Sequence, residues 1–278
     1  MDTMNHEAVE IAREYYNSKD ADTFYSTIWG GEDIHIGLYY SDTDSILEAS
    51  RRTQMRMANH LDSLDSASRV IDMGSGYGGS ARFLAKKYNC EVVAVNLSEV
   101  ENERARALNR EQQLGNSIEV VDGNFEDLEY DDESFDIVWS QDAFLHSPAR
   151  KQVVREATRV LKPGGDFIFT DPMQSDDCPE GVLQPILNRI HLESMATPAF
   201  YREAAAEFGL REIYFDELTE HLKKHYSAVL NETNKRQYEL KDQISGEYSQ
   251  NMKKGLKHWI NGATKGYLSW GILHFRKE

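Results

Sequence analysis

A glycine-rich segment, Gly74-Ser75-Gly76-Tyr77-Gly78-Gly79, is the group of residues that most clearly suggests chemistry. It directly follows Arg69-Val70-Ile71-Asp72-Met73, a short apolar run typical of a buried strand. Glycines between a strand and a helix allow the backbone to approach a ligand, which the N-terminus of the helix then faces. The pattern alone indicates either a ligand site or a tight turn without a ligand.

A dinucleotide dehydrogenase is one class of protein that carries such a segment. It normally has an acidic residue about 20 positions further on, which holds the ribose hydroxyls of the cofactor. This chain instead has Asn96, at the end of the apolar run Glu91–Asn96. An asparagine can still hydrogen-bond a ribose diol, but its presence here disfavours a dehydrogenase.

Alternating strand and helix patterns must position the glycine-rich segment. Ser98 and Glu101 predict a capping box at the start of the helix after the second strand. Five strand–helix units in series imply an α/β fold with a mostly parallel sheet and helices on both faces. Ligands bind at the carboxyl ends of such strands, so the loops after the first four strands are expected to line a site. The predicted strands are 69–73, 91–96, 118–121, 135–139 and 166–170.

The segments outside this alternation have other patterns. One-face spacing predicts a helix near residues 8–16 and another over about 44–61, and the residues 24–37 between them are typical of an aromatic, glycine-rich loop. Residues 172–201 do not continue the alternation, and residues 219–256 are typical of long, charged helix. The last residues alternate like a final strand of the sheet, 267–276.

Composition excludes several classes of protein. The formal net charge is −16 in 278 residues, which argues against nucleic-acid binding and against attachment to anionic membranes. No window approaches 18 uninterrupted apolar residues, and the first residues are polar, so we expect neither a membrane span nor a signal peptide. Cys90 and Cys178 stand in no CxxC setting, so we expect neither disulfide bonds nor a zinc site. The same cysteine usage predicts a cytoplasmic location. The acidic excess fits adaptation to salt or an ordinary acidic enzyme.

Three blocks together resemble the class I S-adenosylmethionine methyltransferases. They are Val70–Gly79, Asp122–Leu128 followed by Ser134–Val138, and Leu161–Gly165. The resemblance implies a Rossmann-like class I methyltransferase fold, with a mostly parallel seven-stranded sheet, and S-adenosylmethionine as the methyl donor. It also implies an N-terminal helical cap with a cofactor-covering loop at 1–66, and a methyltransferase core at 67–278. Within that core a helical substrate lid is expected at about 172–205 and 219–258.

The same resemblance assigns the cofactor-binding residues. Gly74 and Gly76 would approach the methionine part, Asn96 the ribose and Gln141 the methionyl end. This chain departs from many relatives by having Asn96 in place of Asp or Glu, and Asn124 in place of Asp. The full set implied is Asp72, Gly74, Ser75, Gly76, Asn96, Leu97, Ser98, Asn124, Phe125 and Gln141.

Further segments resemble the sarcosine/dimethylglycine N-methyltransferases of glycine betaine synthesis. They are Ile28–Tyr39, Asn96-Leu97-Ser98, Thr170–Pro179 and Trp270–Lys277. This resemblance implies methylation of sarcosine and N,N-dimethylglycine to betaine, an osmolyte. The alternatives are another small acceptor, such as phosphoethanolamine or a quinone, and an S-adenosylmethionine-binding regulatory protein without catalysis. The polar segment 219–247 favours a small polar acceptor.

Methyl transfer to an amine sets the demands on the acceptor site. The amine must approach the methyl carbon opposite sulfur, so orientation supplies most of the catalysis, and the amine must first lose its proton. His146, just after the fourth strand, is the first candidate to contact the substrate, or else a surface or capping histidine. The product is a quaternary cation, which the aromatic faces of Tyr25, Trp29 and Tyr39 could stabilise, although they could also only pack the loop.

The remaining candidates concern the substrate carboxylate and a lid. An arginine matches a carboxylate, and Arg189 is preferred to Arg202 because it follows an apolar segment, although either could be merely solvated. His35, between glycines and isoleucines, could close over the cofactor. Asp176 and Asp177 have no ligands at metal spacing, so no metal is expected. The oligomeric state is left open, because no heptad seam marks an interface.

Overall fold

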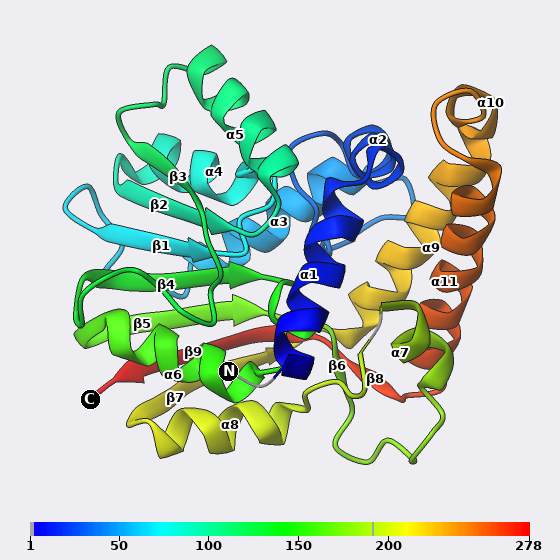
Figure 1. Ribbon diagram of the computed structural model, residues 1–278. Coiled ribbons are helices and arrows are strands. Elements are labelled where there is room, and N and C mark those ends of the chain that lie inside the picture. Colours follow the sequence, from blue (N-terminus) through cyan, green and yellow to red (C-terminus); the bar gives the residue numbers. More distant parts are fainter. Residues whose placement is uncertain (1–2, 191) are drawn as a thin grey trace.

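A seven-stranded sheet forms the centre of the protein, which we describe from a computed structural model covering residues 3–190 and 192–278 (Figure 1). Its strands are β1 (Arg69–Met73), β2 (Glu91–Asn96), β3 (Ile118–Asp122), β4 (Phe135–Gln141), β5 (Leu161–Thr170), β7 (Leu210–Glu217) and β9 (Gly271–Lys277). The strand order is β3-β2-β1-β4-β5-β9-β7. Only β9 runs antiparallel to its neighbours β5 and β7 in this sheet. A separate short ladder pairs β6 (Met173–Gln174) with β8 (Leu268–Ser269).

Helices cover both faces of the sheet, because its strands are apolar on both sides. Along β1, Val70 belongs to one buried cluster and Ile71 to the other. The cluster with Val70 includes side chains of α3 (Ile46–Ala58) and α4 (Gly79–Tyr88). The cluster with Ile71 includes side chains of α6 (Arg150–Val160) and α8 (Pro198–Glu207). The predicted α/β fold with a mostly parallel seven-stranded sheet is therefore confirmed.

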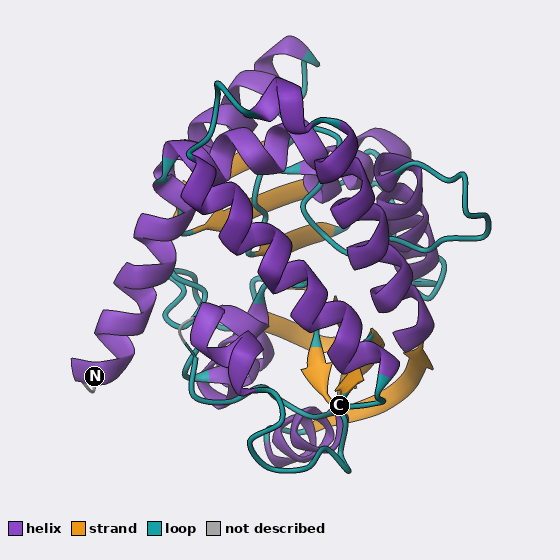
Figure 2. Cartoon of the chain, turned by 90° about the vertical axis from the view of Figure 1, so that its right-hand side faces the viewer, coloured by secondary structure: helices purple, strands orange, loops and turns teal. Residues whose placement is uncertain are grey.

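A second group of helices lies beyond the carboxyl ends of the strands (Figure 1). It comprises α1 (Thr3–Asn17), α2 (Lys19–Ile28), α7 (Gln184–Ile190), α9 (Thr219–Lys235), α10 (Gln237–Leu240) and α11 (Gly246–Thr264). Figure 2 looks onto this side of the molecule, with strands visible behind the helices. Helices α9 and α11 pack along each other, and α11 also packs on α7. In the part of the chain that the structure describes, no helix is both long and apolar enough to cross a membrane.

The loop between α2 and α3 is fastened to α9 by two histidines. His221 Nδ1 accepts a hydrogen bond from the backbone N–H of Tyr39 at 3.0 Å. His225 Nδ1 accepts one from the N–H of Gly37 at 3.2 Å and lies 3.0 Å from the Tyr39 hydroxyl. On its other side the loop is bonded to α3, where the Thr53 hydroxyl donates to the carbonyl of Ile36. The loop is thus a fixed layer between α3 and α9.

Several predicted boundaries were wrong. Residues 24–28 are helical rather than part of a loop, because Ser18 caps α2 and its first turn is acidic. The helix predicted over 44–61 spans Ile46–Ala58, and the strand predicted over 166–170 begins five residues earlier, at Leu161. The sequence analysis located no strand at β7, an edge strand whose side chains are mostly exposed.

The predicted division into cap, core and lid stays a prediction, although its segments can be placed. Helix α8, at the end of the stretch 172–205, packs on α6 and β7 and contributes Tyr201 to the core of the sheet. Residues 219–258 form α9, α10 and most of α11. The lid, if defined by packing, therefore contains α7, α9, α10 and α11 but not α8.

The attachment of the loop by His225 predicts a pH-dependent stability. Burial, and with it the nearby His35, lowers the pKa of His225 to about 3, against about 6.5 in an unfolded chain. Between these values the unfolded state binds the additional proton, so stability falls as the pH falls. This group alone should lower the free energy of unfolding by about 2 kcal/mol between pH 7 and pH 5. Replacing His225 by Asn, which keeps a hydrogen-bond acceptor but cannot titrate, should remove that part of the pH dependence.

Urea unfolding of the wild type and of His225→Asn at both pH values measures this effect. The variant should be less stable than the wild type at pH 7, because the ring is lost from a buried position, but should lose less stability on acidification. An equal loss in both proteins would contradict the account.

Candidate functional site

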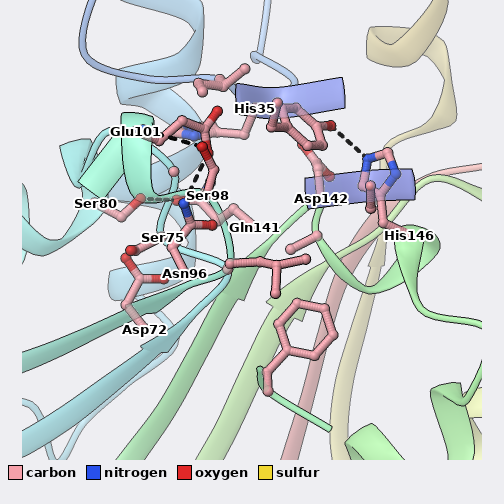
Figure 3. A pocket seen from close by; sticks show the side chains of 18 of the residues that line it. His35, Asp72, Ser75, Ser80, Asn96, Ser98, Glu101, Gln141, Asp142 and His146 are labelled. Carbon is pink, nitrogen blue, oxygen red and sulfur yellow. Dashed lines mark hydrogen bonds between the residues drawn. The ribbon is translucent and has the colours of Figure 1, made fainter. Parts of the chain in front are cut away.

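A cleft lies at the carboxyl ends of β1, β2, β3 and β4, beneath α1 (Figure 3). It encloses about 970 Å³ of empty space, counted out to its opening. The structure brings together in this one cleft all the residues predicted to bind the cofactor. They are Asp72, Gly74, Ser75, Gly76, Asn96, Leu97, Ser98, Asn124, Phe125 and Gln141.

Glycines form part of the floor of the cleft, because the backbone there is closely packed. Gly74 and Gly76 have φ angles of 82° and 52°, in the left-handed region that other residues rarely adopt. A Cβ atom on Gly74 would lie 2.3 Å from the Cβ of Ala143. The loop ends at Gly78, after which the first residues of α4, Gly79 and Ser80, line the cleft. Backbone N–H groups at a helix start therefore face the cleft, as the glycine pattern predicted.

Four buried polar atoms of the cleft have no hydrogen-bond partner among the described residues. They are Asp72 Oδ2, Ser75 Oγ, Gln141 Nε2 and Arg13 Nε. Burial, together with the charge of Asp33, raises the pKa of Asp72 to about 7. The Ser80 hydroxyl donates to Gln141 Oε1, which leaves the amide nitrogen of Gln141 as the unpartnered end. Buried polar atoms are rarely left unpaired, so this set of donors and acceptors indicates a polar ligand such as an amino-acid group.

A carboxylate that the sequence analysis treated as a helix cap also lines the cleft. Glu101 accepts a hydrogen bond from Asn96 Nδ2 at 2.9 Å. The predicted capping box is therefore only half formed: Ser98 accepts from the N–H of Glu101, but the Glu101 side chain turns to Asn96. Burial, partly offset by the Asn96 hydrogen bond, raises the pKa of Glu101 to about 7. The acidic group missing at the end of β2 is thus supplied by the first turn of α5 (Glu99–Glu111).

A second cavity opens from the first beneath the cap helices. Its walls are rich in aromatic side chains from α1, α9, α11 and α2 with its C-cap residue, namely Tyr15, Tyr16, Tyr25, Trp29, Tyr226 and Trp259. The predicted residues Tyr25, Trp29 and Arg189 line it, and His35 and His146 line both cavities. The shared lining residues are Ala12, Tyr16, Ile34, His35, Asp142 and His146. A ligand in one cavity can therefore meet a ligand in the other.

His146 lies at this junction as a neutral imidazole. A hydrogen bond of 2.8 Å joins its Nε2 to the hydroxyl of Tyr16 (Figure 3). Burial, and after it the positive charges of Arg150 and Arg189, lowers the pKa of His146 to about 4. At neutral pH the ring is therefore uncharged, with one nitrogen protonated and a lone pair on the other.

Arg189 brings an unpaired positive charge to the second cavity. Its Nε is buried without a hydrogen-bond partner, and its Nη2 lies 3.1 Å from the sulfur of Met252. Within residues 3–190 and 192–278 no carboxylate forms an ion pair with it, and, against the effect of burial, the groups that raise its pKa are the hydroxyls of Tyr15, Tyr25 and Tyr248. The indole N–H of Trp29, which lines the same cavity, is also buried without a partner. A buried charge is costly without a counterion, so these donors indicate an anionic ligand.

Two other candidates lie elsewhere. Arg202 pairs with Glu212 at 2.6 Å on the outer side of α8, outside both cavities, so the structure favours Arg189. The Tyr39 hydroxyl bonds to His225 and lines neither cavity, so this ring packs the loop and does not contribute to an aromatic cage.

His35 occupies a fixed position. Its Nε2 donates to the carbonyl of Ser50 at 3.1 Å, and the Ser50 hydroxyl donates back to the carbonyl of His35. The residue is therefore held on α3 as part of a wall, and a role as a moving lid stays a hypothesis.

Asp142 was missed by the sequence analysis and connects three segments. It has a φ angle of 54° at the end of β4, a conformation that Asp tolerates better than most residues. Its carboxylate accepts the N–H of Ile36 at 2.6 Å and the indole N–H of Trp270 at 2.7 Å. Burial raises the pKa of Asp142, although these hydrogen bonds oppose the shift.

Other wall residues also went unnoticed in the sequence. Tyr15 and Tyr16 were on the predicted helical stripe, which marked them as apolar packing residues. Tyr226, Met252 and Gly255 lie on the long charged segment, where nothing in the pattern marks a binding residue. Among the described residues no group of three or more metal-ligating side chains occurs, and the expected absence of a metal stays a prediction.

The chain is similar to known methyltransferases in both sequence and structure. Residues 71–169 match the methyltransferase domain family. The sarcosine/dimethylglycine N-methyltransferase of Halorhodospira halochloris is 60% identical over 271 residues, covering 98% of this chain and 97% of the relative. That of Aphanothece halophytica is 50% identical over 266 residues, covering 96% of each. A crystal structure from Galdieria sulphuraria, provisionally named a sarcosine dimethylglycine methyltransferase, has a TM-score of 0.88 at 43% identity, covering 93% of this chain and 98% of that one.

The electrostatic link between Arg189 and His146 can be measured without any ligand. Replacing Arg189 by Met should raise the pKa of His146 above about 4, because a nearby positive charge is removed. The value should stay below 6.5, because burial remains the larger cause. Histidine C–H signals followed by NMR against pH report both values. His225 is the internal control, because its pKa is lowered by burial and by His35. The pKa of His225 should therefore not change in the Arg189→Met variant. An unchanged pKa of His146 would show that the charge of the guanidinium does not affect the imidazole.

Proposed function

The chain belongs to the sarcosine/dimethylglycine N-methyltransferase family, and we propose that it methylates sarcosine and N,N-dimethylglycine to glycine betaine with S-adenosylmethionine. The membership confirms the resemblance found in the sequence. The observation that carries the choice of acceptor is Arg189, a guanidinium without a counterion in an aromatic cavity next to the cofactor cleft. Sarcosine and dimethylglycine combine one carboxylate with one methylated amine, which are the two groups such a cavity can bind.

The cleft suits the donor, which carries an amino acid, a ribose and an adenine. Asp72, Ser75 and Gln141 present unpartnered polar atoms, which would bind the ammonium and carboxylate of its methionine part. The pair Asn96 and Glu101 would hold the ribose hydroxyls, and the ring of Phe125 would contact the adenine. When bound, S-adenosylmethionine supplies a methyl group on a sulfonium, which an amine nitrogen can displace in line.

The second cavity orients the acceptor. We assign its carboxylate to the guanidinium of Arg189, whose Nε is buried without a partner, and to the indole N–H of Trp29, which is also without one. The amine would then lie toward the shared opening, next to the rings of Tyr16 and Tyr25. Aromatic faces attract the cation that forms on nitrogen, with an effect of about 0.5–2 kcal/mol. Fixing both ends of so small a molecule limits its motion, and this orientation is the main source of catalysis.

The acceptor nitrogen also needs a free lone pair. An ammonium must lose its proton before attack, and His146, neutral and at the shared opening, is the side chain placed to accept it. A carboxylate bound to Arg189 would offset one of the charges that lower the pKa of His146. Binding of the acceptor would therefore make the imidazole a better base in the complex than in the free protein.

The wider properties of the chain agree with this function. Betaine is an osmolyte, and a net charge of −16 keeps a protein soluble when salt accumulates. Cys90 and Cys178 are both free thiols, which fits the reducing cytoplasm that we propose as its compartment.

A methylation assay tests the proposal directly. The purified protein is offered S-adenosylmethionine with glycine, sarcosine or dimethylglycine separately, and the products are identified by mass. Betaine should form from dimethylglycine, and both dimethylglycine and betaine from sarcosine. Phosphoethanolamine is the comparison acceptor, because its phosphate could also pair with Arg189. Methylation of phosphoethanolamine without methylation of the amino acids would contradict the proposed acceptor.

Variants then locate the acceptor site. Arg189→Met keeps the apolar stem but removes the charge, and should lower kcat/KM for dimethylglycine about 30- to 1000-fold, mainly through KM. The affinity for S-adenosylmethionine, measured by calorimetry, should change little because Arg189 does not line the cofactor cleft. Arg202→Met, on the outer side of α8, is the matched control and should behave as the wild type.

A further inference from the structure

Helix α11 contains a glycine in its interior at a position that faces the acceptor cavity. Gly255 is buried and lies nine residues after the start of the helix at Gly246. Glycine inside a helix is less favourable than alanine by about 1 kcal/mol. Its φ angle does not lie in the left-handed region, so backbone conformation does not require glycine here. The reason must therefore be the space that a side chain would fill.

The side chain of Arg189 occupies that space. A Cβ atom on Gly255 would lie 2.3 Å from both Cδ and Nε of Arg189, and 3.1 Å from its Cζ. Such distances exclude any side chain unless the arginine moves. The stem and guanidinium of Arg189, at the end of α7, thus lie directly on the backbone of α11, in agreement with the contact between these helices.

The neighbours of Gly255 on the same face of α11 form the rest of the surface on which Arg189 packs. Tyr248 and Met252 lie seven and three residues before Gly255, and Trp259 lies four residues after it. This spacing places all of them in one stripe on the same side of the helix. Met252 contacts Arg189 Nη2 through its sulfur at 3.1 Å. The ring of Trp259 stacks on Tyr226 of α9 with centroids 5.1 Å apart, and the Tyr248 hydroxyl is joined to that of Tyr15 on α1. The stripe is therefore held by its neighbours and cannot easily yield to a displaced arginine.

We propose that Gly255 is a positioning residue for the acceptor: its missing side chain lets Arg189 lie flat on α11 and present its guanidinium to the substrate carboxylate. This inference rests on the proposed function, because it assumes that Arg189 binds that carboxylate. It adds that the binding depends on a wall residue that has no side chain of its own. The guanidinium cannot be oriented by an acidic partner, because such a partner would compete with the substrate, and a close-packed surface orients it instead.

The first variant is Gly255→Ala. Displacement of the guanidinium should raise KM for dimethylglycine about 10- to 100-fold, the effect of weakened hydrogen bonds to a charged group. The affinity for S-adenosylmethionine should stay within about twofold, because Gly255 does not line the cofactor cleft. Gly246→Ala is the matched control in the same helix, because a Cβ there meets nothing within 4 Å. It should leave KM unchanged.

A double-mutant cycle separates this role from a merely structural one. In an Arg189→Ala background the space above Gly255 is free, so adding Gly255→Ala should cause no further rise in KM. Strong non-additivity of this kind is expected for residues in direct contact. Additive effects, or an unchanged KM in Gly255→Ala alone, would overturn the proposal. If Gly255→Ala does not fold, folding of the double variant supports the proposal, and failure of both variants overturns it.

The wild type distinguishes the two hypotheses. A wild type that forms no betaine refutes the proposed function, whatever the variants do. A wild type that forms betaine, together with a Gly255→Ala variant of unchanged KM, refutes only the inference about Gly255.

Discussion

The buried carboxylate of Asp142 is the interaction on which the site depends. It accepts one hydrogen bond from the loop after α2 and one from Trp270 before the last strand, and it directly follows the last residue of β4. Three segments that are far apart in the sequence therefore meet at one side chain. Both cavities are lined by this residue, so it fixes the wall through which donor and acceptor must face each other. In-line transfer tolerates little displacement, and a shared rigid wall provides that accuracy.

The two cavities carry opposite electrostatic character around a neutral centre. Burial raises the pKa of both Asp72 and Glu101 to about 7 in the cofactor cleft, and Asp72 Oδ2 has no hydrogen-bond partner there. The acceptor cavity instead contains a guanidinium without a counterion, and the imidazole between the cavities is uncharged at neutral pH. The donor and acceptor thus bring charges that complement different regions, which directs each molecule to its own cavity.

The sequence predicted the sheet better than the lid, for physical reasons. Strands β1 and β2 begin and end at the predicted residues because their buried runs are continuous and lie directly before turn residues. Strand β7 escaped detection because an edge strand with exposed side chains has no such run. The ten residues that the family resemblance assigned to the cofactor are close in sequence to the strands that carry them, and all ten line one cleft. The acceptor cavity is built from α1, α2, α7, α9 and α11, and nothing local marks Tyr226, Met252 or Gly255 as its walls. Glu101 has two local interpretations, cap or ligand contact, and only the contact with Asn96 decides between them.

The central claim is that Arg189 holds the acceptor carboxylate while the amine faces the cofactor cleft. A crystal structure with S-adenosylhomocysteine and dimethylglycine bound together tests it most directly. The account predicts a carboxylate oxygen within about 3 Å of a guanidinium nitrogen of Arg189, with the amine nitrogen at the opening near His146. A carboxylate bound elsewhere, with Arg189 turned away from the cavity, would contradict it.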